Sequence, residues 1–219
     1  MSVARHEPLS PEQFAQAENV SRETLDRLRR YVALLERWQG RINLVGRSTL
    51  EDPWRRHLQD SAQLASLVEG IVVVDLGSGA GLPGLILAIM RPELEVHLIE
   101  SDSRKCAFLR EAARATGAKP VIHNFRIEAV APFSSDVVTA RALAPLGKLL
   151  DLAVRFTPKQ CLFLKGEEAE RELTESSRRW SMAVERIPSR SDPRGVILRL
   201  SEISFASHIR HRQSEGRSG

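Results

Sequence analysis

The sequence predicts an α/β fold built on a mostly parallel sheet, and three observations support this prediction. An apolar run at 71–74 ends in an aspartate, a glycine-rich turn follows, and an apolar helix pattern begins at Leu85, which is how a parallel βα unit opens. Further strand-like runs then alternate with helical patterns. A chain of 219 residues with 42% hydrophobic content can form one domain with an added subdomain.

Residues 1–69 are predicted to form a helical extension packed on the core. Ser10 can cap a first helix, with Pro11 in its first turn and Gln13 closing a capping box. Pro53 permits a further helix before the first strand.

A long amphipathic helix is predicted inside this extension, between Ser21 and Gly40. Its apolar stripe follows three- and four-residue steps through Leu25, Leu28, Val32, Leu35 and Trp38. Its opposite face carries Arg22, Arg29, Arg30 and Arg37. Such a face is either solvated or turned toward RNA, and the sequence leaves both interpretations open.

His57 and Asp60 lie one turn apart in the helix predicted after Pro53 and can meet on its surface. We expect an ordinary helix-surface pair. The spacing alone assigns no functional role to either residue.

Four strand-like runs follow the glycine turn, at 95–100, 119–124, 136–140 and 160–166. Helices are expected after Ser101 or Asp102, at 146–156 and at 167–178. Val121 and Ile122 are expected in the core. The runs 182–187 and 195–201 alternate like a hairpin, which predicts an antiparallel last strand at an edge of the sheet.

The glycine turn is a candidate ligand site. Gly77, Gly79 and Gly81 remove Cβ atoms where the chain bends, so a ligand can lie against the main chain and the first N–H groups of the next helix. The dinucleotide fingerprint requires a third glycine where this chain has Leu82, which disfavours a dehydrogenase. Glycine turns also occur in α/β proteins that bind no cofactor.

Polar residues follow the carboxyl ends of the predicted strands, the edge where open α/β sheets bind ligands. Glu100 ends the second strand and can accept both ribose hydroxyls of an adenosine ligand, and Glu128 can recognise an adenine ring. Arg141 is a candidate for substrate or cofactor contact, the alternative being a structural ion pair with Asp75 or Glu100. Lys165 ends the fifth strand.

Composition narrows the class of protein. No run reaches the roughly 18 apolar residues of a membrane span, and residues 1–10 contain no apolar leader, so a cytoplasmic protein without a membrane partner is expected. Cys106 and Cys161 fall in apolar patterns typical of buried thiols. The six histidines lack the spacing of metal ligands, so no metal site is expected. A net charge of +4 is compatible with a polyanionic partner.

The core is predicted to span residues 70–206. Residues 207–219 are polar and basic without an apolar period, which predicts a disordered tail. Nothing in the sequence requires a dimer, so a monomer is expected.

Four segments resemble, in order, motifs of the RsmG (GidB) methyltransferase family. Residues 43–61 resemble its Asn-Leu…Arg-His-x-x-Asp-Ser segment, and 75–84 its Gly-Ser-Gly-Ala-Gly-Phe-Pro-Gly motif. Residues 139–142 resemble its Ser-Arg-Ala element, and 164–166 its Leu-Lys-Gly. The similarity spans roughly residues 31–166.

The resemblance implies an S-adenosylmethionine-dependent enzyme that methylates N7 of a guanine in bacterial 16S rRNA. It also implies the class I methyltransferase fold, a Rossmann-like, mostly parallel seven-stranded sheet with an antiparallel last strand. The cofactor contacts that it implies are Gly77, Leu82, Ile127, Glu128 and Arg141, with Glu100 at the acidic ribose position. Leu82 stands where the family often has Phe, and Ile86 where it often has Pro.

The implied reaction needs no catalytic base, because guanine N7 carries a lone pair and no proton. Catalysis then consists mainly of holding N7 in line with the sulfonium methyl, about 3 Å away. We expect Arg141 to orient the base or the cofactor carboxylate, and Lys165 and Arg56 to hold RNA phosphates.

Two alternatives remain on sequence alone. A small-molecule or protein methyltransferase would share the cofactor half without needing the segment 43–61 or the basic helix face. A noncatalytic RNA-binding module would keep the fold and show no turnover.

Overall fold

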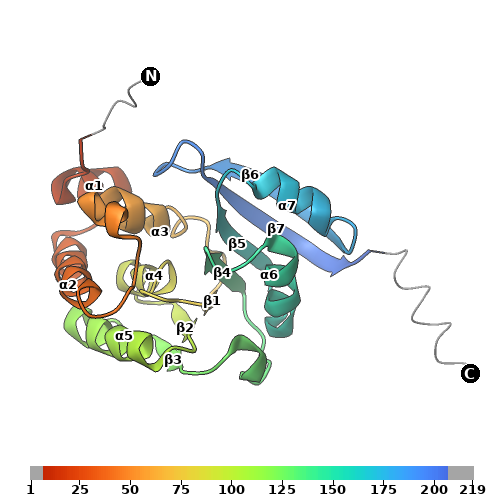
Figure 1. Ribbon diagram of the computed structural model, residues 1–219, viewed down its shortest axis with the longest axis horizontal. Coiled ribbons are helices and arrows are strands. Elements are labelled where there is room, and N and C mark those ends of the chain that lie inside the picture. The colour runs from red at the N-terminus through yellow and green to blue at the C-terminus, as the bar shows by residue number, and fades with distance from the viewer. Residues whose placement is uncertain (1–6, 207–219) are drawn as a thin grey trace, which may run out of the picture.

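A central seven-stranded sheet organises residues 7–206, the part of the chain that this computed structural model describes (Figure 1). The strands are β1 (Val72–Leu76), β2 (Glu95–Ile99), β3 (Val121–His123), β4 (Val137–Arg141), β5 (Gln160–Lys165), β6 (Trp180–Pro188) and β7 (Val196–Phe205). Their order in the sheet is β3-β2-β1-β4-β5-β7-β6. Strands β1 to β5 are parallel, and β7 is antiparallel to both β5 and β6. The predicted α/β class with an antiparallel last strand is confirmed.

Helices cover both faces of this sheet (Figure 1). The chain before the sheet forms α1 (Pro11–Glu18), α2 (Arg22–Gln39), η1 (Arg47–Glu51), η2 (Trp54–Gln59) and α3 (Asp60–Ala62). Between the strands lie α4 (Gly84–Met90), α5 (Ser103–Thr116), η3 (Ile127–Ala129), α6 (Leu146–Ala153), η4 (Val154–Phe156) and α7 (Ala169–Ser176). Helices α2, α4 and α5 cover one face, and α6 and α7 the other.

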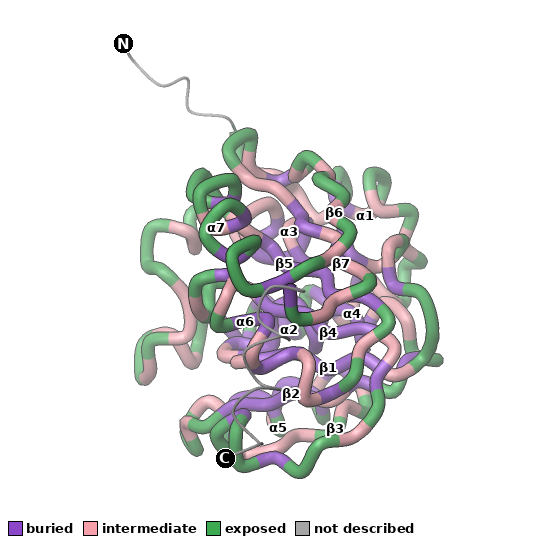
Figure 2. The backbone as a smooth tube through the Cα atoms, turned by 90° about the vertical axis from the view of Figure 1, so that its right-hand side faces the viewer, coloured by how far each residue is buried: buried purple, intermediate pink, exposed green. Residues whose placement is uncertain are grey.

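The sheet divides the core in two, because successive residues of a strand point to opposite faces. Val73 packs in the cluster that contains side chains of α2, α4 and α5, whereas Val74 packs with those of α6 and η4. Figure 2 shows buried residues along the central strands and exposed ones on the outer turns. The carboxyl ends of the central strands are therefore held from both sides.

The caps predicted at Ser10 and at Asp102 are confirmed, and Ser21 is a further cap. The Ser10 hydroxyl accepts a hydrogen bond from the Gln13 N–H at 3.1 Å, and the Gln13 side chain accepts one from the Ser10 N–H at 2.9 Å. Ser21 caps α2 by accepting from the Thr24 N–H, and Asp102 caps α5. Each cap satisfies N–H groups that the first turn of a helix leaves free.

Two details of the predicted sheet were wrong. The last strand, β7, lies second from the edge, because it pairs with β5 on one side and β6 on the other; β6, with more exposed residues, forms the edge. Val121 is 44% exposed and Ile122 is partly buried, because the short β3 is the opposite edge strand.

The predicted disordered tail, 207–219, lies outside the described residues. The division of the chain between residues 69 and 70 stays a prediction. Side chains from both sides of that boundary belong to one hydrophobic cluster.

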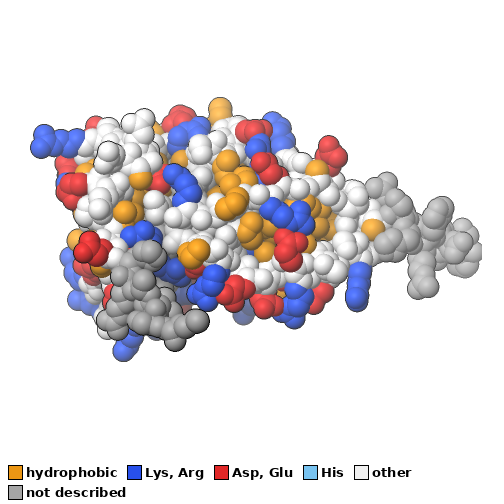
Figure 3. All heavy atoms as spheres, turned by 90° about the horizontal axis from the view of Figure 1, so that it is seen from above, with side chains coloured by type: hydrophobic (Ala, Val, Ile, Leu, Met, Phe, Trp, Pro, Cys, Tyr) orange, Lys and Arg blue, Asp and Glu red, His pale blue; other side chains and the backbone are white. Residues whose placement is uncertain are grey.

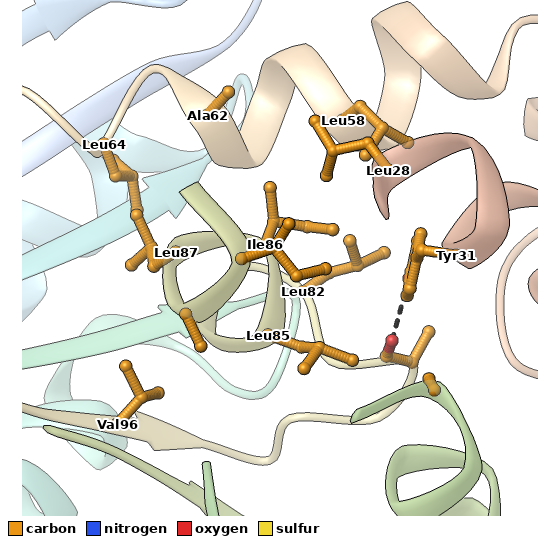
Figure 4. Close-up of a cluster of buried hydrophobic side chains, with 14 of the residues drawn as sticks. Leu28, Tyr31, Leu58, Ala62, Leu64, Leu82, Leu85, Ile86, Leu87 and Val96 are labelled. Carbon is orange, nitrogen blue, oxygen red and sulfur yellow. Dashed lines mark hydrogen bonds between the residues drawn. The ribbon is translucent and has the colours of Figure 1, made fainter. Parts of the chain in front are cut away.

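The helices before the sheet hold the glycine turn in place. Figure 4 shows Leu28 and Tyr31 of α2 and Leu58 of η2 gathered around α4, which begins directly after the turn. The Tyr31 hydroxyl is buried and donates a 2.8 Å hydrogen bond to the carbonyl of Ala80 within the turn. The extension is therefore part of the scaffold of the turn.

Gly84 is the position where α4 lies closest to the sheet. A Cβ added there would lie 2.5 Å from Leu98 Cδ2 and 2.7 Å from the Asp75 Cβ. We expect Gly84→Ala to destabilise the protein by about 2–3 kcal/mol, because the crowded core must shift. Urea unfolding measures this, with Gly40→Ala as the matched control. Gly40 has helical φ and nothing closer than 3.8 Å, so Gly40→Ala should change stability by less than about 1 kcal/mol. Equal losses would contradict the close-approach account.

Candidate active site

The glycine turn after β1 brings bare backbone to the carboxyl edge of the sheet. Gly77 has φ +64°, a conformation that L side chains rarely adopt, and a Cβ there would lie 2.6 Å from Leu143 Cδ1. The turn is braced to the neighbouring strand, since the Ser78 N–H donates to the carbonyl of Ile99 at 3.0 Å. The turn therefore presents its main chain at this edge, with the Leu143 side chain packed directly against Gly77.

Glu100, directly after β2, is fastened to the same turn. Its Oε2 accepts a hydrogen bond from the Gly79 N–H at 2.9 Å, and its Oε1 accepts one from the Asp102 N–H at 2.8 Å. A carboxylate has about four lone-pair sites, so both oxygens can still accept from a ligand. The ion pair between Glu100 and Arg141, considered as an alternative from the sequence, does not form.

Asp75 is fully buried at the end of β1 and holds the turn from within. Its carboxylate accepts hydrogen bonds from the Thr139 hydroxyl at 2.9 Å and from the Gly84 N–H at 3.2 Å. Burial, with the charge of Glu100 adding to it, raises the pKa of Asp75 to about 6, although the hydrogen bonds oppose this. Asp75 therefore positions the glycine turn and, within residues 7–206, forms no ion pair with an arginine.

Two adjoining cavities lie on either side of the turn. One, the Glu100 cavity, has a volume of about 360 Å³ and is lined by Glu100, Ile127 and Glu128 among others. The other, the Leu82 cavity, has a volume of about 380 Å³ and is lined by Leu82, His57 and Arg141 among others. Gly77, Lys105 and Ala142 line both. The structure thus brings all the predicted cofactor residues to one continuous, elongated site.

Arg141 is held by groups other than those predicted. Its Nε lies 3.2 Å from Asp60 Oδ2, and its Nη2 donates to the Arg56 carbonyl and to His57 Nδ1, both at 3.1 Å. The suggested ion pairs with Asp75 and Glu100 are therefore wrong, because η2 and α3 place Asp60 nearer. Its Nη1 is buried and has no hydrogen-bond partner among the described residues.

His57 is not the helix-surface residue that its spacing suggested. It is 1% exposed, and its ring hydrogen-bonds to Arg141, to which the Asp60 carboxylate is also ion-paired; the Asp60 N–H donates to the His57 carbonyl within the helix. Because an arginine can only donate, His57 Nδ1 is the acceptor and Nε2–H donates to the Thr49 hydroxyl at 2.8 Å. Burial, assisted by the charges of Arg141 and Arg56, lowers the pKa of His57 to about 3. His57 is therefore a neutral support for Arg141.

The two residues predicted to hold RNA phosphates are both ion-paired. Lys165 Nζ lies 2.6 Å from Glu172 Oε2 and donates to the Ala144 carbonyl, and the Lys165 side chain is 10% exposed. Arg56 Nη1 lies 2.8 Å from Asp192 Oδ2, with its side chain 40% exposed. The geometry favours Arg56 over Lys165 for contact with a phosphate, and both contacts stay predictions.

The Lys165–Glu172 pair should matter for stability. Both side chains are at least 87% buried, so removing one leaves the other charge without its partner. We expect Lys165→Met to cost about 3 kcal/mol, and Lys165→Met with Glu172→Leu to recover most of it. The control is Arg171→Met in the exposed Arg171–Glu168 pair, which should cost less than about 1 kcal/mol. Thermal unfolding of the four proteins checks this, and an unaffected single variant would refute it.

Three groups at this edge were not predicted from the sequence. Lys105, in the first turn of α5, lines both cavities. Ser191 and Asp192 reach the edge from the turn between β6 and β7. The position of Ser191 and Asp192 could have been predicted from the hairpin. With β7 antiparallel to β5, β6 runs parallel to β5, so the turn after β6 lies at the carboxyl edge of the sheet.

The described residues, 7–206, contain no helix long and apolar enough to cross a membrane. Within the same range, no group of three or more His, Cys, Asp or Glu side chains is placed to hold a metal ion. Cys106 and Cys161 are buried and free, as predicted.

The strand order, the glycine turn and the acid after β2 define the class I methyltransferase fold. Solved structures agree: a methyltransferase from Geobacter sulfurreducens superposes with a TM-score of 0.56 at 17% identity, covering 89% of this chain and 97% of that one. Magnesium protoporphyrin IX methyltransferase from Synechocystis PCC 6803, solved with bound S-adenosylmethionine, gives 0.55 at 15% identity, covering 83% and 97%. At this level of identity the similarity concerns the fold.

The chain belongs to the GidB family, rRNA small subunit methyltransferase G, whose family model matches residues 24–195. A ribosomal RNA small subunit methyltransferase G from Rhodospirillum rubrum is 56% identical over 202 residues, covering 90% of this chain and 100% of the relative. The protein of the same description from Paramagnetospirillum magneticum is 54% identical over 200 residues, covering 90% and 97%. The expected family and enzyme class are confirmed.

Proposed function

We propose that this protein transfers the methyl group of S-adenosylmethionine to N7 of a guanine in bacterial 16S rRNA, acting as a monomer in the cytoplasm. The observation that carries the proposal is the elongated site formed by the Glu100 and Leu82 cavities, with an acid at one end and Arg141 at the other. The names of the relatives supply the class of acceptor.

The cofactor fits this site residue by residue. Glu100 and Gly77 line the same cavity, which supports binding of the two ribose hydroxyls by the Glu100 carboxylate and of the nucleoside beside the Gly77 backbone. Ile127 and Glu128 line the end of the Glu100 cavity that would take the adenine ring. Leu82 lines the other cavity, which would take the methionine portion with less apolar area than a phenylalanine offers.

Glu100 provides a direct test of this placement. Glu100→Gln would turn an NH₂ group toward the N–H of Gly79 or Asp102 and remove the charged acceptor. We expect the Kd for S-adenosylmethionine to rise on the order of 100-fold, the loss typical of hydrogen bonds to a charged group. Titration calorimetry measures it. Glu95→Gln, at the other end of β2, is the matched control and should leave the Kd unchanged. A Kd for Glu100→Gln within threefold of wild type would place the ribose elsewhere.

Methyl transfer to guanine N7 requires mainly that the protein hold the base and the cofactor in the correct relative position. The lone pair of guanine N7 attacks the methyl carbon, the bond from carbon to sulfur breaks, and no proton is removed. The neutral, fully bonded His57 beside the site fits a reaction without a base. Arg141 Nη1, buried without a partner among the described residues, is a donor available to the base or to the cofactor carboxylate. Proximity and orientation then supply most of the rate.

RNA binding is proposed to depend on scattered cations. On the face seen in Figure 3, Lys and Arg side chains alternate with Asp and Glu. On α2, Arg29 pairs with Glu12 and Arg37 pairs with Glu111, which favours a solvated face for these two residues. Arg56 remains the candidate nearest the site. Phosphate contacts of this kind weaken steeply with salt.

Mapping N7-methylguanine in 16S rRNA tests the proposal. RNA from cells with and without the gene is cleaved chemically at N7-methylguanine and read by primer extension. One position present in wild type, lost on deletion and restored by the plasmid-borne gene is the expected result. Identical maps would refute the proposal.

A second assay separates the alternatives. Purified protein with labelled S-adenosylmethionine is offered small ribosomal subunits, naked 16S rRNA and a panel of small molecules. Label in RNA supports the proposal, and label only in a small molecule supports that other class of methyltransferase. Cofactor binding by calorimetry with no turnover on any acceptor supports a noncatalytic RNA-binding module.

A further inference from the structure

A third cavity adjoins the Leu82 cavity at the same edge of the sheet and has no role so far. This Asp192 cavity has a volume of about 360 Å³. Its walls come from the ends of β4 and β5 and from the turn between β6 and β7, and they include Arg141, Ala142, Leu164, Ser191, Asp192 and Val196. Arg141 and Ala142 also line the Leu82 cavity. A group bound in the Asp192 cavity therefore lies next to a ligand bound in the Leu82 cavity.

Three of the carboxylates that line this cavity differ in how they are held. Asp60 is held by Arg141 Nε at 3.2 Å and by the Ser191 hydroxyl at 2.6 Å. Glu172 is held by Lys165 and by the Leu146 N–H, both at 2.6 Å. These partners fix Asp60 and Glu172 as parts of the scaffold.

Asp192 is the carboxylate of the three that can receive a ligand. Its Oδ1 accepts from the Arg194 N–H at 3.0 Å, which fixes the turn, and its Oδ2 meets Arg56, whose side chain is 40% exposed. Burial works against its ionisation, but the Arg194 N–H and Arg56 outweigh it and keep the pKa of Asp192 below its usual value. With about four lone-pair sites, an ionised Asp192 can keep both partners and accept two more hydrogen bonds.

We infer that the Asp192 cavity takes the target base and that Asp192 recognises it as guanine, by accepting hydrogen bonds from its N1–H and its exocyclic N2 amino group. This inference rests on the proposed function. The Watson–Crick edge of guanine presents two adjacent donors, which match the two oxygens of a carboxylate. Adenine presents a bare N1 lone pair at the same place, which a carboxylate repels.

The other edge of the base then faces the methyl donor. Guanine N7 and O6 lie side by side on the edge that does not carry the N2 amino group. With N1 and N2 toward Asp192, that edge can turn toward Arg141, which lines both this cavity and the Leu82 cavity. Arg141 Nη1, for which the described part of the chain supplies no hydrogen-bond partner, can donate to O6 and leave the lone pair of N7 free. Leu164 and Val196 supply apolar walls for the ring of a base extruded from its stack.

The test pairs an enzyme substitution with a base substitution. Inosine lacks the N2 amino group, so 16S rRNA assembled by ligation with inosine at the mapped position removes one partner of Asp192. For wild type, inosine should lower kcat/KM by about 10-fold or more. Asp192→Asn should lower kcat/KM on the natural RNA by on the order of 10- to 100-fold, and should then respond to inosine by less than about twofold. Its Kd for S-adenosylmethionine should equal that of wild type.

Two further variants control for structure. Arg56→Met breaks the same ion pair with Asp192 but keeps the carboxylate, so its inosine penalty should stay at that of wild type whatever it loses in RNA affinity. Asp192→Ser keeps an acceptor for the Arg194 N–H and replaces Asp192→Asn if that variant does not fold.

The outcomes separate the inference from the function on which it rests. If wild type methylates the mapped guanine but shows no inosine penalty, or if the Asp192 variants keep the full penalty, the base is not recognised by Asp192 and only this inference fails. If wild type methylates no guanine in 16S rRNA, the proposed function fails as well.

Discussion

Arg141→Ala should abolish methyl transfer at saturating S-adenosylmethionine and should also destabilise the protein by about 3 kcal/mol. Arg141 makes an ion pair with Asp60 and donates to His57 and to the Arg56 carbonyl, so its removal leaves the mostly buried Asp60 charge without its cation. The loss should lie at the low end for buried pairs, because the two side chains are 21% and 17% exposed. Methyl transfer should fail because the substitution also removes Arg141 Nη1, the donor proposed to contact the base or the cofactor carboxylate.

Arg141→Lys separates these two effects. Lysine keeps the positive charge and can form an ion pair with Asp60. Its compact ammonium group cannot contact Asp60, His57 and a ligand at the same time, as the planar guanidinium does. We expect Arg141→Lys to recover at least half of the stability in urea unfolding and to remain at least 100-fold slower in single-turnover transfer. If Arg141→Ala transferred methyl groups at the wild-type rate with saturating cofactor, Arg141 would have no place in the reaction.

Acid should unfold this protein partly through His57. The pKa of His57 is about 3 in the folded protein, against about 6.5 when unfolded, so between these values the unfolded chain binds the extra proton. Stability from this group is therefore complete above pH 6.5 and is lost as pH falls toward 3, by as much as about 5 kcal/mol. Asp75 acts oppositely: its raised pKa of about 6 means that stability from Asp75 falls as pH rises from about 4 to 6.

Comparison with His57→Asn isolates the histidine, because both proteins contain Asp75. An asparagine Oδ1 can replace His57 Nδ1 as the acceptor for Arg141 and does not titrate. The variant should be less stable than wild type at pH 7, and the difference should shrink by about 2.5 kcal/mol at pH 4.5. Urea unfolding at both values measures it. A difference that stays constant with pH would mean that His57 titrates normally in the folded protein.

The sequence was sufficient for features that depend on local pattern. The run of 71–74 followed by glycines predicted β1, the turn and α4, because a buried strand and a tight turn leave few alternatives. Ser10 was identified as a cap, and Asp102 as one of two candidate caps, from residue type and spacing alone. Glu100 was placed at the turn because parallel strands end at one edge.

Side-chain contacts between residues far apart in the chain could not be predicted from the sequence. The alternative considered for Arg141 was an ion pair with Asp75 or Glu100, at the ends of nearby strands, but Asp60 reaches it from a helix 81 positions earlier. Such a contact depends on how η2 and α3 sit on the sheet, and no local pattern encodes that placement. The buried environment of His57 was missed for the same reason, since its spacing to Asp60 suits a surface pair equally well.

The hydrogen bond from Tyr31 to the carbonyl of Ala80 has a consequence for how such a protein can be altered. The glycine turn that is proposed to bind the methyl donor does not hold its conformation alone, since its Ala80 carbonyl accepts a hydrogen bond from Tyr31 of α2. Moving the glycine turn into another protein, or exchanging the helices before the sheet between relatives, should lower the affinity for the methyl donor. Transferring the turn and these helices together should avoid that loss.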